Sequence, residues 1–72
     1  MAGISKFDKE KIISEFKMMK EMELSARDLY AKIAGLPDVE QQVKITFATM
    51  AKDEQRHADL VQKIINIVTN TL

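Results

Sequence analysis

The stretch of sequence that decides the fold is Met50-Ala51-Lys52-Asp53-Glu54-Gln55-Arg56-His57-Ala58-Asp59-Leu60. Apolar residues recur around it in alternating steps of four and three, which is the spacing of residues on one face of an α-helix. The members of this apolar series are Val43, Phe47, Met50, Val61, Ile64 and Val68. The two positions that the series skips hold Glu54 and His57, which lie three residues apart and so share a helix face. The sequence therefore predicts a helix whose apolar face carries a carboxylate and an imidazole near its middle.

The first half of the chain shows the same pattern. Its apolar series consists of Ile12, Phe16, Met19, Ala26, Tyr30 and Ile33. The position that this series skips holds Glu23. A chain reversal midway between Glu23 and Glu54 falls between residues 38 and 39, next to the turn residues, and it brings Glu23 level with Glu54 and His57. The sequence thus predicts two carboxylates and one imidazole meeting inside an apolar interface.

Turn-forming residues divide the chain into two helices. Ser5 precedes the first helical segment in an N-capping position, and Asp8 follows three residues later. Gly35 suits a C-cap in the left-handed region, and Pro37 prevents the first helix from continuing. The expected elements are helix 1 over about 6–34, a turn at 35–37 and helix 2 over about 38–68. The last four residues are expected to fray.

Each helix has an apolar arc that is wider than one neighbouring helix can cover. The residues that widen the two arcs are Ile13, Met18, Met22, Leu24, Leu29, Leu60 and Ile67. A chain of 72 residues also lies near the lower size limit for a stable independent core. We therefore expect an all-α fold in which residues 1–72 form one two-helix antiparallel hairpin. Two hairpins would pair as a homodimer or within a higher homo-oligomer and make a four-helix bundle.

Such a dimer would hold Glu23, Glu54 and His57 from each chain in its core. Four ionised carboxylates would repel one another there, and two divalent cations would neutralise them. Oxygen-rich ligation with one imidazole per metal suits iron or manganese and also accepts zinc or cobalt. One glutamate from each of two helices, with Glu-x-x-His from each of the other two, is the ligand set of di-iron and di-manganese carboxylate bundles. We expect two iron ions per dimer, one per chain, with manganese as the alternative and zinc as a substitute.

Composition narrows the classes of function. The chain has 11 basic and 11 acidic residues, intermixed, so there is no basic patch to favour nucleic-acid binding. It has no cysteine, and therefore no thiolate ligand or thiol nucleophile. Its apolar runs are too short to span a membrane, and its N-terminus lacks a signal-peptide pattern. There is no glycine-rich phosphate loop either. We expect a cytoplasmic protein that binds neither nucleic acid nor membranes.

Two stretches carry a resemblance to a known family. They are Glu23-Leu24-Ser25-Ala26-Arg27-Asp28-Leu29-Tyr30 and Met50-Ala51-Lys52-Asp53-Glu54-Gln55-Arg56-His57. They resemble the two metal helices of the ferritin-like superfamily, which includes the rubrerythrins, over residues 10–68. The short two-helix form is most similar to encapsulated ferritin-like proteins. The resemblance implies a ferritin-like half-domain with Glu23, Glu54 and His57 as metal ligands and with Tyr30 as a residue that contacts these ligands. The lack of cysteine leaves no rubredoxin-like centre, and the Thr-Asn-Thr-Leu C-terminus differs from the usual shell-targeting tail.

The resemblance further implies oxidation of Fe(II) with dioxygen or peroxide, either for iron storage inside an encapsulating protein shell or for rubrerythrin-like peroxide handling. Another hypothesis is a non-catalytic helical assembly module, either stabilised by metal or free of it. Two residues also have two interpretations. Tyr30 would donate a hydrogen bond to a ligating carboxylate or pack as a core tyrosine. Asp53 would accept from the second ring nitrogen of His57 or remain a surface acid.

Overall fold

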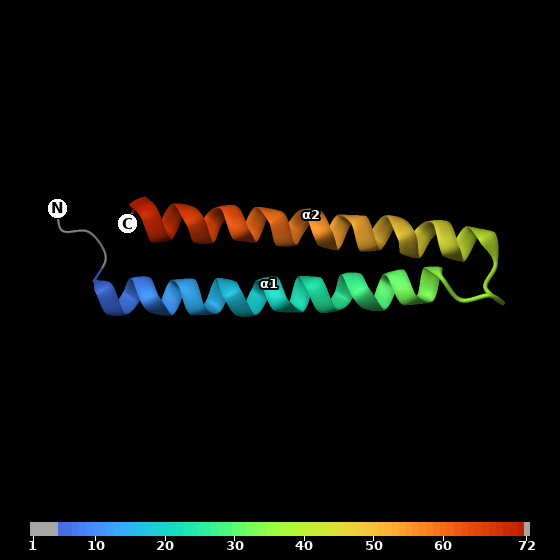
Figure 1. The fold of residues 1–72 in the computed structure, drawn as a ribbon, viewed down its shortest axis with the longest axis horizontal. Helices are drawn as coiled ribbons and strands as arrows, with labels where there is room; N and C mark the ends of the chain where they lie inside the picture. Colours follow the sequence, from blue (N-terminus) through green and yellow to red (C-terminus); the bar gives the residue numbers. More distant parts are fainter. Residues whose placement is uncertain (1–4, 72) are drawn as a thin grey trace.

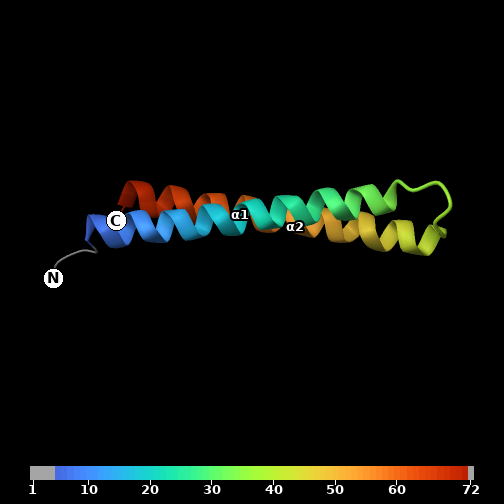
Figure 2. The same cartoon turned by 90° about the horizontal axis from the view of Figure 1, so that it is seen from below.

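Two long antiparallel helices make up the fold (Figure 1). The computed structural model describes residues 5–71, with α1 at Lys6–Ala34 and α2 at Gln41–Thr71. The hairpin is long and narrow and measures 58 × 14 × 13 Å. Figure 2 shows that the helices cross at a shallow angle and overlap near the middle of their length. The predicted all-α hairpin is confirmed.

The ends of α1 follow from local hydrogen bonding. Ser5 has an extended backbone and its Oγ accepts a hydrogen bond from the Asp8 amide at 3.1 Å, which confirms the expected N-cap. At the other end the Gly35 amide donates to the carbonyls of Ala31 and Lys32 at 3.1 and 3.2 Å. Gly35 has φ −90° and ψ −2°, so the expected left-handed C-cap is wrong. The last turn instead tightens to three-residue hydrogen bonds, which satisfy carbonyls at the helix end.

The second helix begins and ends three residues later than expected. It starts at Gln41 because the turn needs residues 35–40 to cross from one helix to the other, and the Lys44 amide then donates to the Glu40 carbonyl at 3.0 Å. It continues to Thr71, whereas fraying was expected from residue 69. The Thr69 carbonyl accepts a hydrogen bond from Lys9 Nζ at 2.9 Å, which ties this end of α2 to α1.

The core of the hairpin lies on one face of α2. Its buried residues are Ala51, Ala58, Val61, Ile65 and Val68. The predicted burial of Val61 and Val68 is confirmed. The predicted burial of Ile64 is wrong, because Ile64 is 38% exposed and its neighbour Ile65 is only 5% exposed. The apolar series predicted for residues 43–68 runs along the middle of the wide apolar arc of α2. The hairpin buries only the part of this arc that faces α1. On α1 the apolar residues at the contact are half-buried, and none is fully buried.

The two flanks of the hairpin, defined as the long sides where both helices reach the surface, differ in chemistry. The first, the polar flank, has Lys20 Nζ donating to Gln62 Oε1 at 2.6 Å and Arg27 donating to Gln55 Oε1. The second flank, on the side of His57, is called the apolar flank and carries Met19 on α1 and Ile64 on α2, which are 44% and 38% exposed. Other large apolar side chains are exposed farther round the two helices: Met22, Leu29, Leu60 and Ile67. Along residues 5–71 neither helix combines the length and the apolar character that a membrane crossing requires.

The burial pattern predicts that two isoleucines contribute differently to the free energy of unfolding. Ile65→Val removes one methylene from the buried contact and should lower the free energy of unfolding by about 0.5–1.5 kcal/mol. Ile45→Val makes the same chemical change at a side chain that is 51% exposed, and the loss should be clearly smaller. Denaturant unfolding of both variants measures the difference. Equal losses would contradict the packing of α2 against α1 described above.

Candidate metal centre

Three predicted site residues meet near the middle of the hairpin. Glu23 comes from α1, and Glu54 and His57 come from α2. One ligand atom from each of the three lies within 4.8 Å of the other two. His57 Nδ1 lies 3.6 Å from Glu23 Oε2, which is too long for a hydrogen bond. The expectation that Glu23 lies level with the Glu54-x-x-His57 pair is confirmed, while metal ligation by the three stays a prediction.

Small residues make room for this cluster. Glu54 occupies the face of α2 that packs against α1, between Ala51 one turn before it and Ala58 one turn after it. Ala58 is 1% exposed, so the helices pack closely against its methyl group. Larger side chains at either position would fill the space between the helices beside the carboxylates. The small residues on either side therefore place the two acids at a close contact between the helices.

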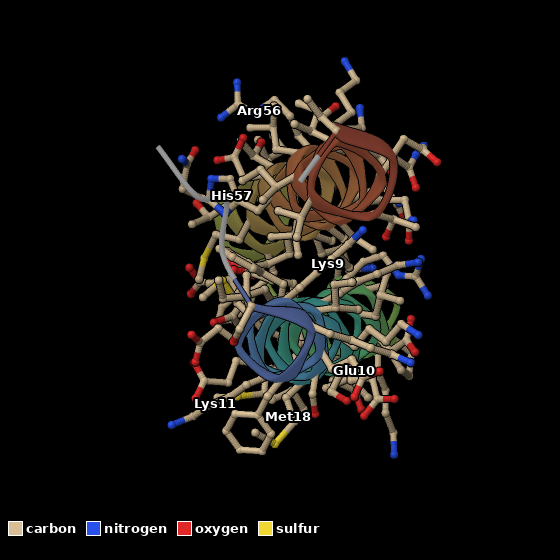
Figure 3. The ribbon with its side chains drawn as sticks, turned by 90° about the vertical axis from the view of Figure 1, so that its left-hand side faces the viewer. Lys9, Glu10, Lys11, Met18, Arg56 and His57 are labelled. Carbon is tan, nitrogen blue, oxygen red and sulfur yellow. The ribbon has the colours of Figure 1, made fainter. Side chains whose placement is uncertain are left out.

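The cluster opens toward the apolar flank. The side chain of Glu23 is 23% exposed and that of His57 is 45% exposed. Figure 3, which looks along the hairpin, shows His57 at one side of α2 and Lys9 between the helices. His57 lies seven residues before Ile64, so the two share a stripe on α2. Any ion held by the three residues would consequently be reached from the apolar flank.

Electrostatics couples the two carboxylates. The pKa of Glu54 is raised above its usual 4.5, chiefly because its carboxyl shares a hydrogen bond with Glu23, and further by desolvation and by the negative charge of Glu23. His57 acts in the opposite direction and lowers this pKa. A hydrogen bond between two carboxyl groups requires a proton on one of them. A divalent cation can replace that proton and neutralise both acids.

Two residues expected near the site have other contacts. The ring of Tyr30 lies against Phe47 with centroids 5.8 Å apart, and within residues 5–71 its hydroxyl makes no hydrogen bond to either glutamate. This geometry agrees with the core-tyrosine interpretation. Asp53 pairs with Arg56 at 3.3 Å, as a surface acid would. Roles for Tyr30 and Asp53 beside a bound metal stay predictions.

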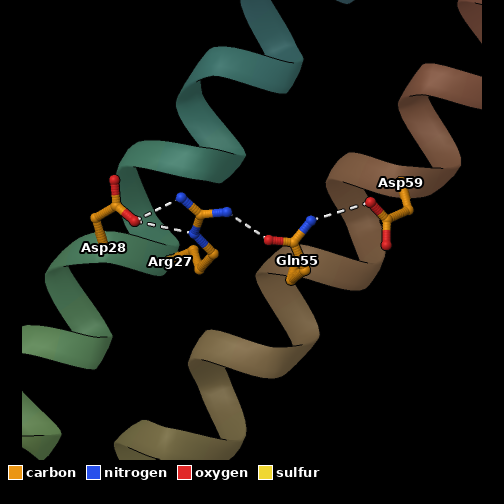
Figure 4. A network of polar contacts seen from close by, with 4 residues as sticks. All are labelled: Arg27, Asp28, Gln55 and Asp59. Carbon is orange, nitrogen blue, oxygen red and sulfur yellow. Dashed lines mark hydrogen bonds and ion pairs between the residues drawn. The ribbon is translucent and has the colours of Figure 1, made fainter.

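The polar flank was not foreseen from the sequence. Arg27 joins Asp28 on its own helix to Gln55 on α2, and Gln55 in turn donates to Asp59 at 3.0 Å (Figure 4). One heptad along α2 the arrangement repeats, because Gln62 accepts from Lys20 and donates to Asn66 at 2.9 Å. The sequence feature that could have predicted these contacts is the pair Gln55 and Gln62, seven residues apart. Each glutamine is followed four residues later by a side chain with an acceptor oxygen, Asp59 or Asn66. These contacts hold the helices together at the level of the site and keep this flank hydrophilic.

Comparisons of the chain with protein families, with curated proteins and with solved structures each find no match.

The raised pKa of Glu54 predicts how the stability of the metal-free protein responds to pH. The folded state raises the pKa of Glu54, so just above pH 4.5 it binds more protons than the unfolded chain does. The contribution of Glu54 to the free energy of unfolding therefore falls as pH rises through this range. Glu54→Gln removes the titrating group and should be more stable than the parent protein at neutral pH in the presence of a chelator.

Thermal melts of both proteins across the acidic to neutral range test this expectation. The control is Asp59→Asn, which changes a carboxylate on the polar flank and should keep the pH profile of the parent. Parallel profiles for Glu54→Gln and the parent protein would contradict the carboxyl–carboxylate pair.

Proposed function

We propose that this protein is a ferritin-like di-iron carboxylate protein that oxidises Fe(II) with dioxygen or peroxide, and that its metal centre is completed across a homodimer. The observation that carries the proposal is the meeting of Glu23, Glu54 and His57 from two helices, with one ligand atom of each within 4.8 Å of the others. Storage of the ferric product inside a protein shell and rubrerythrin-like removal of peroxide are the two uses that this chemistry would serve.

The donor set fits iron. Two carboxylates and one imidazole offer hard oxygen ligands with one nitrogen, a combination that suits Fe(II) or Mn(II) and tolerates zinc. The three ligands come from one hairpin, so they leave coordination positions open for further ligands and for the oxidant. The raised pKa of Glu54 marks a pair of acids that lacks a compensating positive charge. A divalent cation would supply that charge and favour the ionised form of both acids.

The apolar flank supports a second copy as the covering partner. Met19 and Ile64, which are 44% and 38% exposed, lie on this flank beside the cluster, and further large apolar side chains are exposed farther round both helices. A hairpin with five buried residues has little core of its own, and pairing two hairpins would supply the missing burial. Pairing through this flank would also bring two clusters together. The dimer would then hold four carboxylates and two imidazoles around two ions.

Fe(II) is the substrate in this proposal, and each of two ferrous ions gives up one electron. Dioxygen that accepts two electrons and two protons becomes hydrogen peroxide, and peroxide that accepts two electrons and two protons becomes two waters. The protein's own groups would fix the geometry of this exchange. Glu23, Glu54 and His57 would hold the ions, and the two carboxylates would balance their positive charge. The covering copy would exclude bulk water, which strengthens the electrostatic interactions inside the site.

Anaerobic titration of metal-free protein with Fe(II), followed by exposure to air, tests the proposal. We expect saturation near one iron per chain, ferric absorbance that grows faster than in buffer, and dimers or larger species. Glu54→Ala should lose most of the bound iron and of the oxidation rate, because it removes a ligand that the other two cannot replace. Asp59→Ala removes a carboxylate on the polar flank and should behave as the parent protein does.

Two results would contradict part of the proposal. If Glu54→Ala leaves iron content and oxidation unchanged, the site assignment is wrong. Iron binding that raises thermal stability without faster oxidation favours the alternative of a metal-stabilised assembly module, since binding to the folded state alone stabilises it by mass action.

A further inference from the structure

Arg27 follows the candidate metal ligand Glu23 by four residues on α1. Side chains four residues apart meet on the surface of a helix, and a glutamate that precedes a basic residue by this distance is well placed for an ion pair. Arginine keeps its positive charge in proteins, because its guanidinium cannot be deprotonated there. The spacing therefore brings a permanent cation within reach of one carboxylate of the candidate metal centre.

The structure directs this guanidinium elsewhere. Arg27 Nε and Nη2 both donate to Asp28 Oδ1, at 2.9 and 2.7 Å, and Arg27 Nη1 donates to Gln55 Oε1 on α2 (Figure 4). Within residues 5–71 Arg27 forms no ion pair with Glu23. The charged groups that shift the pKa of Glu54 do not include Arg27 either. The one cation near the ion-binding carboxylates on this flank is thus engaged by other acceptors.

Asp28 is the acceptor that holds the guanidinium most firmly. It takes two of the three hydrogen bonds, and a bond between two charged groups is about twice as strong as one to a neutral amide such as that of Gln55. Successive residues of a helix point about 100° apart, so Asp28 lies farther round α1 than Arg27, on the side away from Glu23. The Asp28 side chain is 69% exposed, so it contributes little to packing.

We propose that Asp28 is a positioning residue that holds the Arg27 guanidinium away from Glu23 and so leaves both carboxylates of the cluster to a divalent cation. The inference rests on the proposed function, because it concerns the metal centre which that function needs. Without Asp28 the guanidinium is free to turn to Glu23 and neutralise the charge that the cation requires. An imidazole can release its proton when a metal binds, whereas a guanidinium cannot, so a freed Arg27 competes with the metal.

Four variants separate this role from a general effect of charge. Asp28→Ala removes the acceptor, Arg27→Gln removes the competing cation, and the double variant Arg27→Gln/Asp28→Ala removes both. The matched control is Glu21→Ala, which removes an exposed acid of the same helix that makes no ion pair within residues 5–71. Circular dichroism checks that each variant keeps the helical content of the parent protein. Anaerobic titration with Fe(II) against a coloured chelator then gives each dissociation constant.

We expect Asp28→Ala to raise the dissociation constant for Fe(II) about fivefold, the upper end of what a partly exposed ion pair contributes. In the Arg27→Gln background the same substitution should change the constant by less than about twofold, because the competing cation is absent. Glu21→Ala should stay within that limit of the parent protein. A dependence of the Asp28 effect on Arg27 is the result that a purely structural role of Asp28 would not produce.

The inference is overturned if Asp28→Ala binds Fe(II) as tightly as Glu21→Ala does, or if Asp28→Ala weakens binding equally with and without Arg27. Either result leaves the proposed function intact. Parent protein that binds no Fe(II) would overturn the metal centre of the proposed function, and this inference with it. The comparisons measure binding alone, so a failure of the parent protein to oxidise Fe(II) would contradict the proposed reaction without affecting them.

Discussion

The structure depends on one constraint, which is that two acidic side chains occupy the packed contact of a hairpin only two helices thick. Glu23 and Glu54 face each other where apolar residues would otherwise meet. Their proximity raises the pKa of Glu54 above its usual range. This arrangement reduces stability in the absence of a cation, and a cation would relieve it.

The surroundings of the cluster fit this constraint. Ala51 and Ala58 keep the contact narrow on either side of Glu54. On the polar flank, Arg27 and Lys20 donate to glutamines of α2 and fasten the helices at and near the same level. On the apolar flank His57 remains partly exposed, and within residues 5–71 no other segment covers it. A bound ion in the cluster would thus be held from one side by the hairpin and left open on the other, where a second hairpin would fit.

Much of this arrangement could be predicted from the sequence, because helical periodicity fixes which residues share a face. The spacing of Glu54 and His57, and the position of Glu23 relative to the turn, sufficed to place the three side chains together. Which residues of the wide apolar arc are buried was harder to predict: Ile65 is buried and Ile64 is not, because the arc is wider than the part that packs against α1. The conformation of Gly35 and the start of α2 depend on how the chain crosses between helices, which local residue preferences do not determine. The glutamine contacts of the polar flank were missed because amides at helical spacing also occur on solvated surfaces.

X-ray absorption spectroscopy at the iron edge, on protein loaded with Fe(II) and then oxidised, tests the central claim most directly. Two hairpins joined through their clusters should give oxygen and nitrogen neighbours together with a second iron at about 3.5–4 Å. Glu54→Ala should lose the iron–iron signal. A spectrum of the loaded parent protein with light neighbours alone, at full occupancy and with a dimer present, would show isolated ions and contradict a shared centre.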